Sequence, residues 1–128
     1  MTDRTAVKTP NAPDAIGPYN QAVVAGGFVH CSGQIALDPA TLELVGDDVT
    51  TQAEQVFKNL ANVLVAAGSS FDRVVKCNVW VADMDDFAAL NEVYARHFPA
   101  ETAPARATVA VRTLPKNALV EIDCLALV

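Results

Sequence analysis

PARATVAV, residues 104–111, and LVEIDCL, residues 119–125, both alternate between two kinds of side chain. Because successive side chains of a strand point to opposite faces, this period of two predicts two β-strands. Arg106 then lies on the more polar face of the first strand, and Glu121 lies on the polar face of the second. The two charges form either a solvated surface pair or the charged part of a site, and the alternation leaves both interpretations open.

Composition limits the fold and the partners. The chain has 128 residues, which suits one domain spanning residues 1–128. It is 52% hydrophobic, so we expect a folded core. The net charge is -6 and the basic residues are scattered. Because nucleic-acid binding depends on neutralising phosphates, we expect no nucleic-acid partner, although one arginine can still bind a small carboxylate.

We expect a cytoplasmic protein with no membrane segment. The N-terminus has no charged-then-apolar signal pattern, and no apolar run reaches the roughly 20 residues of a membrane helix. Cys31, Cys77 and Cys124 are widely spaced in apolar strand patterns, which predicts reduced, buried thiols. His30 and His97 have no second ligand at metal-binding spacing, so we expect no metal site.

Patterning elsewhere predicts the remaining elements. They are a short edge strand near residues 6–9, a strand at 19–25, a return strand at 28–37, a helix at 50–67, a strand at 73–82 and a helix from about 85 to 98. The pair Gly26-Gly27 predicts a hairpin, and Gly33 predicts a bulge or a close backbone approach. A capping box over residues 51–54 and a stop at Gly68 are expected to bound the first helix.

The order β-β-α-β-α-β-β predicts an α+β domain with a mixed sheet and both helices on one face. We expect the uncovered face to carry apolar residues such as Trp80 and Leu125 beside Arg106, Glu121 and Asp123. That mixture is too apolar for open solvent and too charged for a core, so it predicts a contact with other subunits and a cleft there. If the last two strands form a hairpin, Arg106 and Glu121 can meet only diagonally, through a long reach, or across a subunit boundary.

Several short motifs occur together in one order along the chain. They are Ile16-Gly17-Pro18-Tyr19, Cys31-Ser32-Gly33-Gln34-Ile35, Asp86-Phe87 with Asn91 and Tyr94, Pro104-Ala105-Arg106, Leu114-Pro115-Lys116 and Val120-Glu121-Ile122. In these motifs the chain resembles the RidA/YjgF family of reactive intermediate deaminases, also called the L-PSP endoribonuclease family. The resemblance implies a chorismate-mutase-like fold and a homotrimer with its active sites between subunits. It also implies hydrolysis of 2-imino acids, such as 2-iminobutanoate and 2-iminopropanoate, to 2-keto acids and ammonia without a cofactor.

The resemblance also implies residue roles. Arg106 matches the arginine that binds the substrate carboxylate, and Glu121 matches the acid that holds the attacking water. Positions that line the pocket in the family correspond here to Tyr19, Gly33 and Asn91. Thr108 stands where some members have a cysteine that contributes its backbone. A guanidinium can grip a carboxylate with two hydrogen bonds, and a carboxylate can accept a proton from water, so these residue types suit imine hydrolysis.

Two other functions remain open from the sequence. A non-catalytic module that binds a small carboxylate, or regulates a partner enzyme, would keep Arg106 but would not need Glu121. A ribonuclease is the third alternative, and the acidic charge and the lack of a basic groove make it the least favoured.

Overall fold

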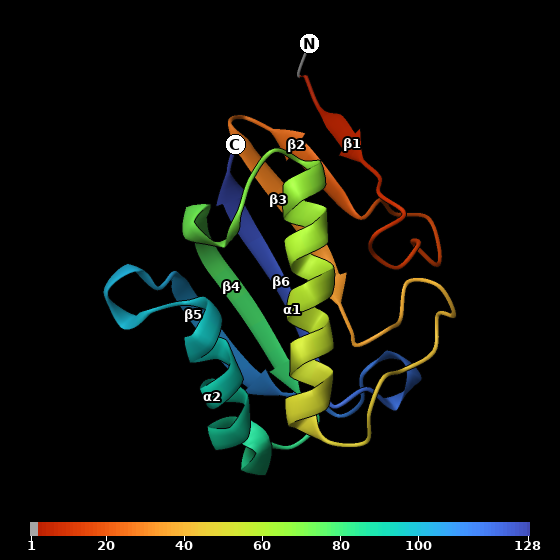
Figure 1. The fold of residues 1–128 in the computed structure, drawn as a ribbon, viewed down its shortest axis with the longest axis vertical. Helices are drawn as coiled ribbons and strands as arrows, with labels where there is room; N and C mark the ends of the chain where they lie inside the picture. The colour runs from red at the N-terminus through yellow and green to blue at the C-terminus, as the bar shows by residue number, and fades with distance from the viewer. Residues whose placement is uncertain (1–2) are drawn as a thin grey trace.

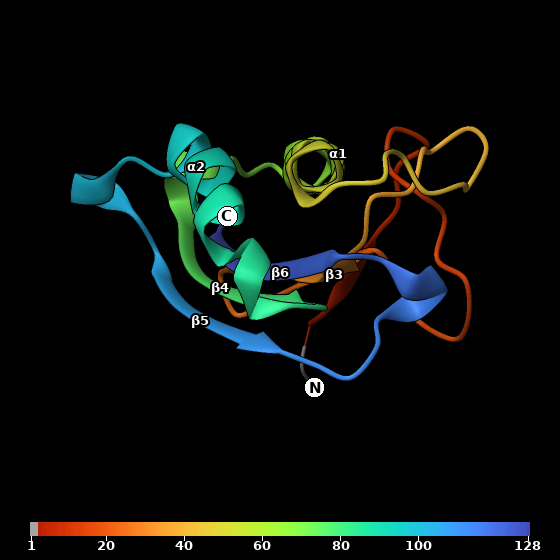
Figure 2. The ribbon, with the colours of Figure 1, turned by 90° about the horizontal axis from the view of Figure 1, so that it is seen from below.

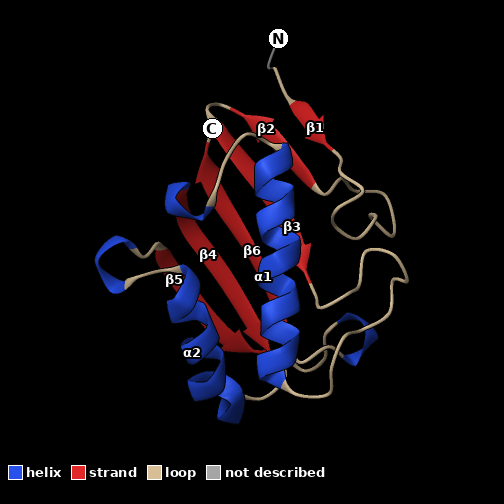
Figure 3. Ribbon diagram, in the orientation of Figure 1, coloured by secondary structure: helices blue, strands red, loops and turns tan. Residues whose placement is uncertain are grey.

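The computed structural model describes residues 3–128, which form a six-stranded mixed sheet with two α-helices on one face (Figure 1, Figure 3). The strands are β1 (Thr5–Val7), β2 (Ala22–Ala25), β3 (Phe28–Gln34), β4 (Val74–Val81), β5 (Ala105–Ala110) and β6 (Val120–Leu127), and the helices are α1 (Val49–Ala66) and α2 (Phe87–His97). The spatial order is β1-β2-β3-β6-β4-β5. Strands β4 and β5 pair in parallel, and the other neighbours are antiparallel. The predicted α+β class is confirmed, and β1 is the short edge strand expected in the arm.

The β2–β3 hairpin forms where the sequence predicts it. Gly26 and Gly27 have φ values of 62° and 83°, and this left-handed geometry at both positions is typical of a tight type I′ turn. Local turns shorten both strands relative to the prediction. The Tyr19 N–H bonds the Gly17 carbonyl at 2.9 Å before β2, and the Leu37 N–H bonds the Ile35 carbonyl at 2.8 Å after β3.

The N-cap of helix α1 is Asp48, three residues before the N-cap that the sequence predicts at Thr51. The Asp48 carboxylate accepts a hydrogen bond from the Thr51 N–H at 2.8 Å, which satisfies a free donor of the first turn. The capping box predicted to start at Thr51 is therefore wrong. The glycine stop is confirmed, because Gly68 has a φ of 82° just past the helix end. Neither helix within residues 3–128 is long and apolar enough to span a membrane.

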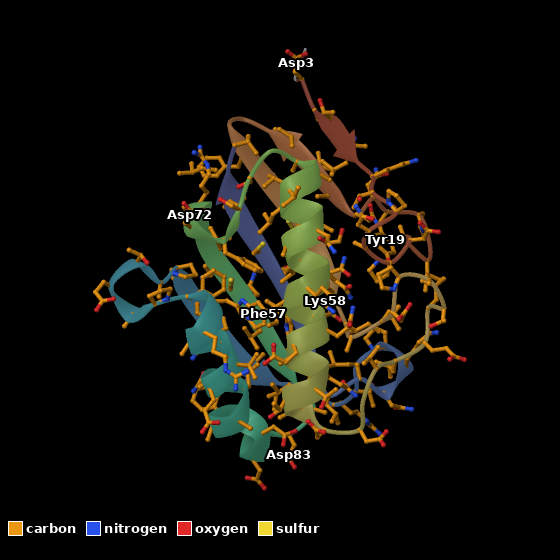
Figure 4. All side chains as sticks on the ribbon, in the orientation of Figure 1. Asp3, Tyr19, Phe57, Lys58, Asp72 and Asp83 are labelled. Atoms are coloured by element: carbon orange, nitrogen blue, oxygen red, sulfur yellow. The ribbon has the colours of Figure 1, made fainter. Side chains whose placement is uncertain are left out.

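Aromatic packing holds α2 beside α1. Phe57 of α1 stacks on His97 with ring centroids 4.4 Å apart, and it meets Tyr94 edge-on at 5.8 Å. Figure 4 shows Phe57 on the side of α1 that faces α2. Figure 2 shows both helices on the same side of the sheet, with α2 above β4 and β5. This packing sets the environment of every helix-facing side chain of β5.

The pairing of β5 corrects the predicted face of Arg106. Strand β5 pairs with β4 and not with β6, so the last two strands do not form a hairpin. Arg106 lies opposite the buried Cys77, which places it on the helix-covered face. Glu121 lies opposite Trp80 on the uncovered face. Alternation shows which residues of a strand share a face, but it does not show which face the helices cover.

The three cysteines form a row across the sheet. Cys31 lies opposite Cys124, and Cys124 lies opposite Cys77. All three are free and buried, as predicted. Burial raises the pKa of Cys77 to about 11. A thiol with so high a pKa carries little thiolate at neutral pH, so it is a poor nucleophile.

Candidate active site

Arg106 is held between β5 and α2. Its guanidinium donates a hydrogen bond from Nη1 to Asn91 Oδ1 at 2.8 Å. The guanidinium carbon lies 4.6 Å from the centre of the Tyr94 ring and 5.5 Å from the centre of the Phe87 ring. The contact over the Tyr94 face is a cation–π interaction, which fixes the guanidinium without neutralising it.

Arg106 has no carboxylate partner within residues 3–128. The ion pair found among residues 3–128 joins Arg96 to Glu54 on the surface. The hydrogen bond to Asn91 uses one of the five guanidinium N–H donors, so the other four can still donate hydrogen bonds to a bound anion. An unpaired arginine held by an amide and two aromatic rings is suited to binding a small carboxylate.

Glu121 lies on the other side of the sheet, against Gly33. A Cβ atom at position 33 would come within 2.9 Å of Glu121 Cδ and closer still to Oε2. The β3–β6 register also shifts between Cys31 and Gln34, so the irregularity predicted at Gly33 is confirmed. Burial, and secondly the charge of Asp123, raise the pKa of Glu121 above its usual range. A raised pKa suits a carboxylate that exchanges a proton with water near neutral pH.

The six predicted site residues form two groups. Arg106, Asn91 and Thr108 gather between β5 and α2, whereas Tyr19, Gly33 and Glu121 line a cavity of about 330 Å³ between the N-terminal arm and the ends of β3 and β6. Strand β4 separates β5 from β6, and Glu121 lies three residues along β6 from Cys124, the residue level with Arg106. The two positions are therefore about 10 Å apart across the sheet and about 10 Å apart along it, and they lie on opposite faces. One protomer therefore does not bring the two charges together.

Tyr19 and Thr108 behave differently within their groups. The Tyr19 hydroxyl accepts a hydrogen bond from the Ile16 N–H at 3.1 Å, and its half-exposed ring lies at the side of the molecule, in the N-terminal arm (Figure 4). Thr108 Oγ1 is enclosed and has no hydrogen-bond partner among residues 3–128. Thr108 therefore brings an unused hydroxyl, as well as its backbone, to the neighbourhood of Arg106.

Replacing Gly33 by alanine is expected to displace the Glu121 carboxylate while leaving the fold intact. The new Cβ would meet the flexible end of a side chain and not the backbone, so we expect a small change in Tm. A misplacement of about 1 Å at a reacting group can cost roughly 100-fold in rate. The measurement is kcat/KM for the imine hydrolysis that the family resemblance implies, and the control is Gly33→Ala combined with Glu121→Gln. Once the carboxylate is gone, Gly33→Ala should add little, and a full additional loss would contradict the explanation.

The comparisons with known proteins agree with this architecture. The sequence model described as Endoribonuclease L-PSP matches residues 9–128. The chain belongs to the L-PSP family. A RutC family protein of Synechocystis is 51% identical over 121 residues, which cover 94% of this chain and 93% of the relative. A Mus musculus protein named 2-iminobutanoate/2-iminopropanoate deaminase is 45% identical over 123 residues, which cover 96% of this chain and 90% of the relative.

Solved structures of the L-PSP family have the same fold. The crystal structure of RidA from the Antarctic bacterium Psychrobacter superposes with a TM-score of 0.92 at 45% identity, covering 97% of this chain and 99% of that one. The resemblance to the RidA/YjgF family is thus confirmed over nearly the whole chain, together with the fold that it implies.

Two residues near the candidate site, Tyr94 and Gln34, were given no site role from the sequence. Tyr94 was expected to be a packing or interface residue, and its ring lies under the guanidinium of Arg106. Gln34 belongs to a motif that carries the resemblance, and the structure places it in the wall of the cavity next to Glu121. Neither role can be predicted from the hydrophobic pattern of one segment, because both depend on which helices and strands are neighbours in the fold.

Proposed function

We propose that this protein hydrolyses 2-imino acids, such as 2-iminobutanoate and 2-iminopropanoate, to 2-keto acids and ammonia. The observation that carries the proposal is the unpaired Arg106 guanidinium, held by Asn91 and Tyr94. The deaminase name of the 45% identical mouse relative supports the same reaction. The proposal also places the protein in the cytoplasm, because three buried free thiols fit a reducing compartment.

The proposed mechanism uses side chains and water. Arg106 grips the substrate carboxylate with two parallel hydrogen bonds and fixes the plane of the C=N bond. Glu121 orients a water molecule and accepts its proton as the oxygen adds to C2. The imine nitrogen takes up a proton from solvent as the oxygen adds, which gives a carbinolamine. Glu121 then passes the water proton to this nitrogen, the hydroxyl group loses its own proton to solvent as the C–N bond breaks, and ammonia leaves while C2 becomes the ketone carbon. Imine hydrolysis is already feasible in water, so orientation and proton transfer supply the catalysis.

In this proposal the site forms between copies of the chain. Arg106 and Glu121 lie on opposite faces of one sheet, so a second copy has to bring its Glu121 group to the Arg106 group of the first. Strand β5 is an edge strand, and Val109 on its uncovered side is 50% exposed next to Trp80. An exposed apolar edge of this kind favours contact with another chain. We therefore propose a homotrimer with three shared sites.

The assembly can be tested by mutation of an exposed valine. Val109→Asp places a charge in the proposed contact and is expected to convert the trimer into monomers with little activity. Val65→Asp is the matched control, since Val65 is 70% exposed on α1, away from the uncovered sheet face. Light scattering should give about three times the 13.5 kDa chain mass for the wild type and the control. A wild-type monomer at micromolar concentration would contradict the shared site.

The function itself is tested with imines made in place by an amino-acid oxidase. Purified protein is expected to speed the release of keto acid and ammonia above the spontaneous rate. If keto acids bind but hydrolysis is not accelerated, the protein is a carboxylate-binding module and not an enzyme. RNA cleavage that survives Arg106→Ala would instead favour a ribonuclease, which the net charge of -6 makes the weakest alternative.

A further inference from the structure

The cavity beside Glu121 has more space, and more apolar lining, than a four-carbon imino acid would fill. Its volume is about 330 Å³, and it starts at Glu121 and Gly33. Its remaining walls are mostly apolar and include Ile16, Ile35 and Leu37. If Glu121 holds the attacking water, C2 of the substrate lies at this end. The substituent on C2 that points away from Arg106 then enters the cavity.

Besides Glu121, the polar or charged residues of the lining are Asp14, Gln21, Gln34 and Lys116. Two of them are buried, and of these two Gln21 is hydrogen-bonded to the N-terminal arm whereas Gln34 has no such bond among residues 3–128. Gln34 lines the cavity and is only 6% exposed. Its carboxamide makes no hydrogen bond to another residue in the range 3–128. The five other buried polar residues all use their side chains in hydrogen bonds: Thr9, Gln21, Gln52, Asn59 and Ser69. Gln34 is thus the exception in the described part of the chain.

The polar atoms of the Gln34 carboxamide are accessible to a ligand in the cavity. The enclosed side-chain polar atoms without a partner in residues 3–128 belong to Tyr94, His97 and Thr108, and not to Gln34. Its polar atoms therefore still reach open space, and Gln34 lines the cavity. Buried amides are nearly always hydrogen-bonded, because an unpaired one loses its bonds to water without replacement. A buried amide that is unpaired and lines a cavity is suited to bind a polar atom of the molecule that fills it.

We propose that this cavity is the side-chain subsite of the enzyme and that Gln34 reads a polar atom on the substrate side chain. The inference rests on the proposed function and extends it. The preferred substrates are 2-imino acids with a side chain longer than that of 2-iminobutanoate and with a hydrogen-bonding group near its end. Gln34 acts here as a specificity residue, and Arg106 and Glu121 keep their roles.

The test uses calorimetric binding of three stable keto acids to the assembled wild-type protein. The probes are pyruvate, 5-methyl-2-oxohexanoate and 2,5-dioxohexanoate. The last two have the same shape, but a carbonyl oxygen in one replaces a methyl group in the other. We expect the apolar longer probe to bind at least about tenfold more tightly than pyruvate, because its four additional carbon atoms are buried in the cavity. We expect the carbonyl probe to bind about three- to tenfold more tightly than its apolar counterpart, as one hydrogen bond allows.

Variants then assign the preference to Gln34. Gln34→Met keeps the side-chain shape and removes the amide, so the apolar probe should now bind more tightly than the carbonyl probe. Gln55→Met is the control on α1 and should keep the wild-type ratio. Gln34→Glu should also lose the preference for the carbonyl probe over the apolar probe, because the new carboxylate has no N–H donor and repels the probe's carbonyl oxygen. This variant also serves if the methionine variant does not fold.

The outcomes separate the two proposals. A wild-type protein that binds both longer probes equally, or prefers the apolar one, overturns the role of Gln34. Pyruvate binding without any gain for the longer probes shows that the cavity is not the side-chain subsite, for example because another copy of the chain fills it, and leaves the proposed reaction standing. If none of the three keto acids binds, the proposed function fails and the subsite fails with it.

Discussion

Arg106→Ala is expected to cause a large loss of imine hydrolysis and to leave the assembly folded. The substrate carboxylate would lose its bidentate partner, and no other arginine lies in this group of residues. Removing one member of a desolvated, hydrogen-bonded charge pair costs about 2–5 kcal/mol, which corresponds to a loss of roughly 30- to 5,000-fold in kcat/KM. The measurement is kcat/KM in the oxidase-coupled assay, with light scattering to verify the assembly.

Two further arginine variants sharpen this result. Arg106→Lys keeps the positive charge but loses the planar fork, so its kcat/KM should fall between those of the wild type and the alanine variant. Arg112→Ala removes the same charge from an exposed position just beyond β5 and should retain wild-type activity. Equal losses in both alanine variants would mean that overall charge, and not a specific contact, attracts the substrate.

Glu121→Gln is expected to lower kcat by about 100- to 10,000-fold, the range for removal of a general base. KM should change much less, because the proposed mechanism assigns the substrate carboxylate to Arg106 and not to Glu121. Wild-type kcat should rise with pH as Glu121 loses its proton, and this acidic limb should disappear in the variant. Glu101→Gln on an exposed turn is the control for the loss of one carboxylate. A variant with an unchanged pH profile would exclude Glu121 as the base.

The raised pKa of Glu121 also has a stability consequence. A carboxyl group whose pKa is higher in the folded state binds its proton more tightly there, so its contribution to stability is present at low pH and is lost as the pH rises through the folded-state value. Glu121→Gln should therefore raise Tm at neutral pH, and this gain should shrink in acid. Asp123→Asn should shift the acidic limb of kcat to lower pH, because the Asp123 charge helps to raise the pKa of Glu121.

Much of the architecture follows from local sequence. Alternating side chains predicted β5 and β6, two glycines predicted the β2–β3 hairpin, and an apolar stripe predicted α1, because each of these signals depends on residues close together in the chain. The motifs around Arg106 and Glu121 were sufficient to identify the family and to name Tyr19, Gly33 and Asn91 as neighbours of a site. Their proposed roles depend on the tests above.

Two features could not be read from local patterns, because they depend on contacts between distant segments. Strand β5 pairs with β4, which moves Arg106 to the face covered by α2 and places it over Tyr94. The arm, the end of β3 and the start of β6 meet around a cavity in which Gln34 has no hydrogen-bond partner from the described residues, 3–128. Periodicity identifies the side chains that share a face of one strand, but the packing of the helices decides whether that face is covered, and the order of strands decides which charges can meet.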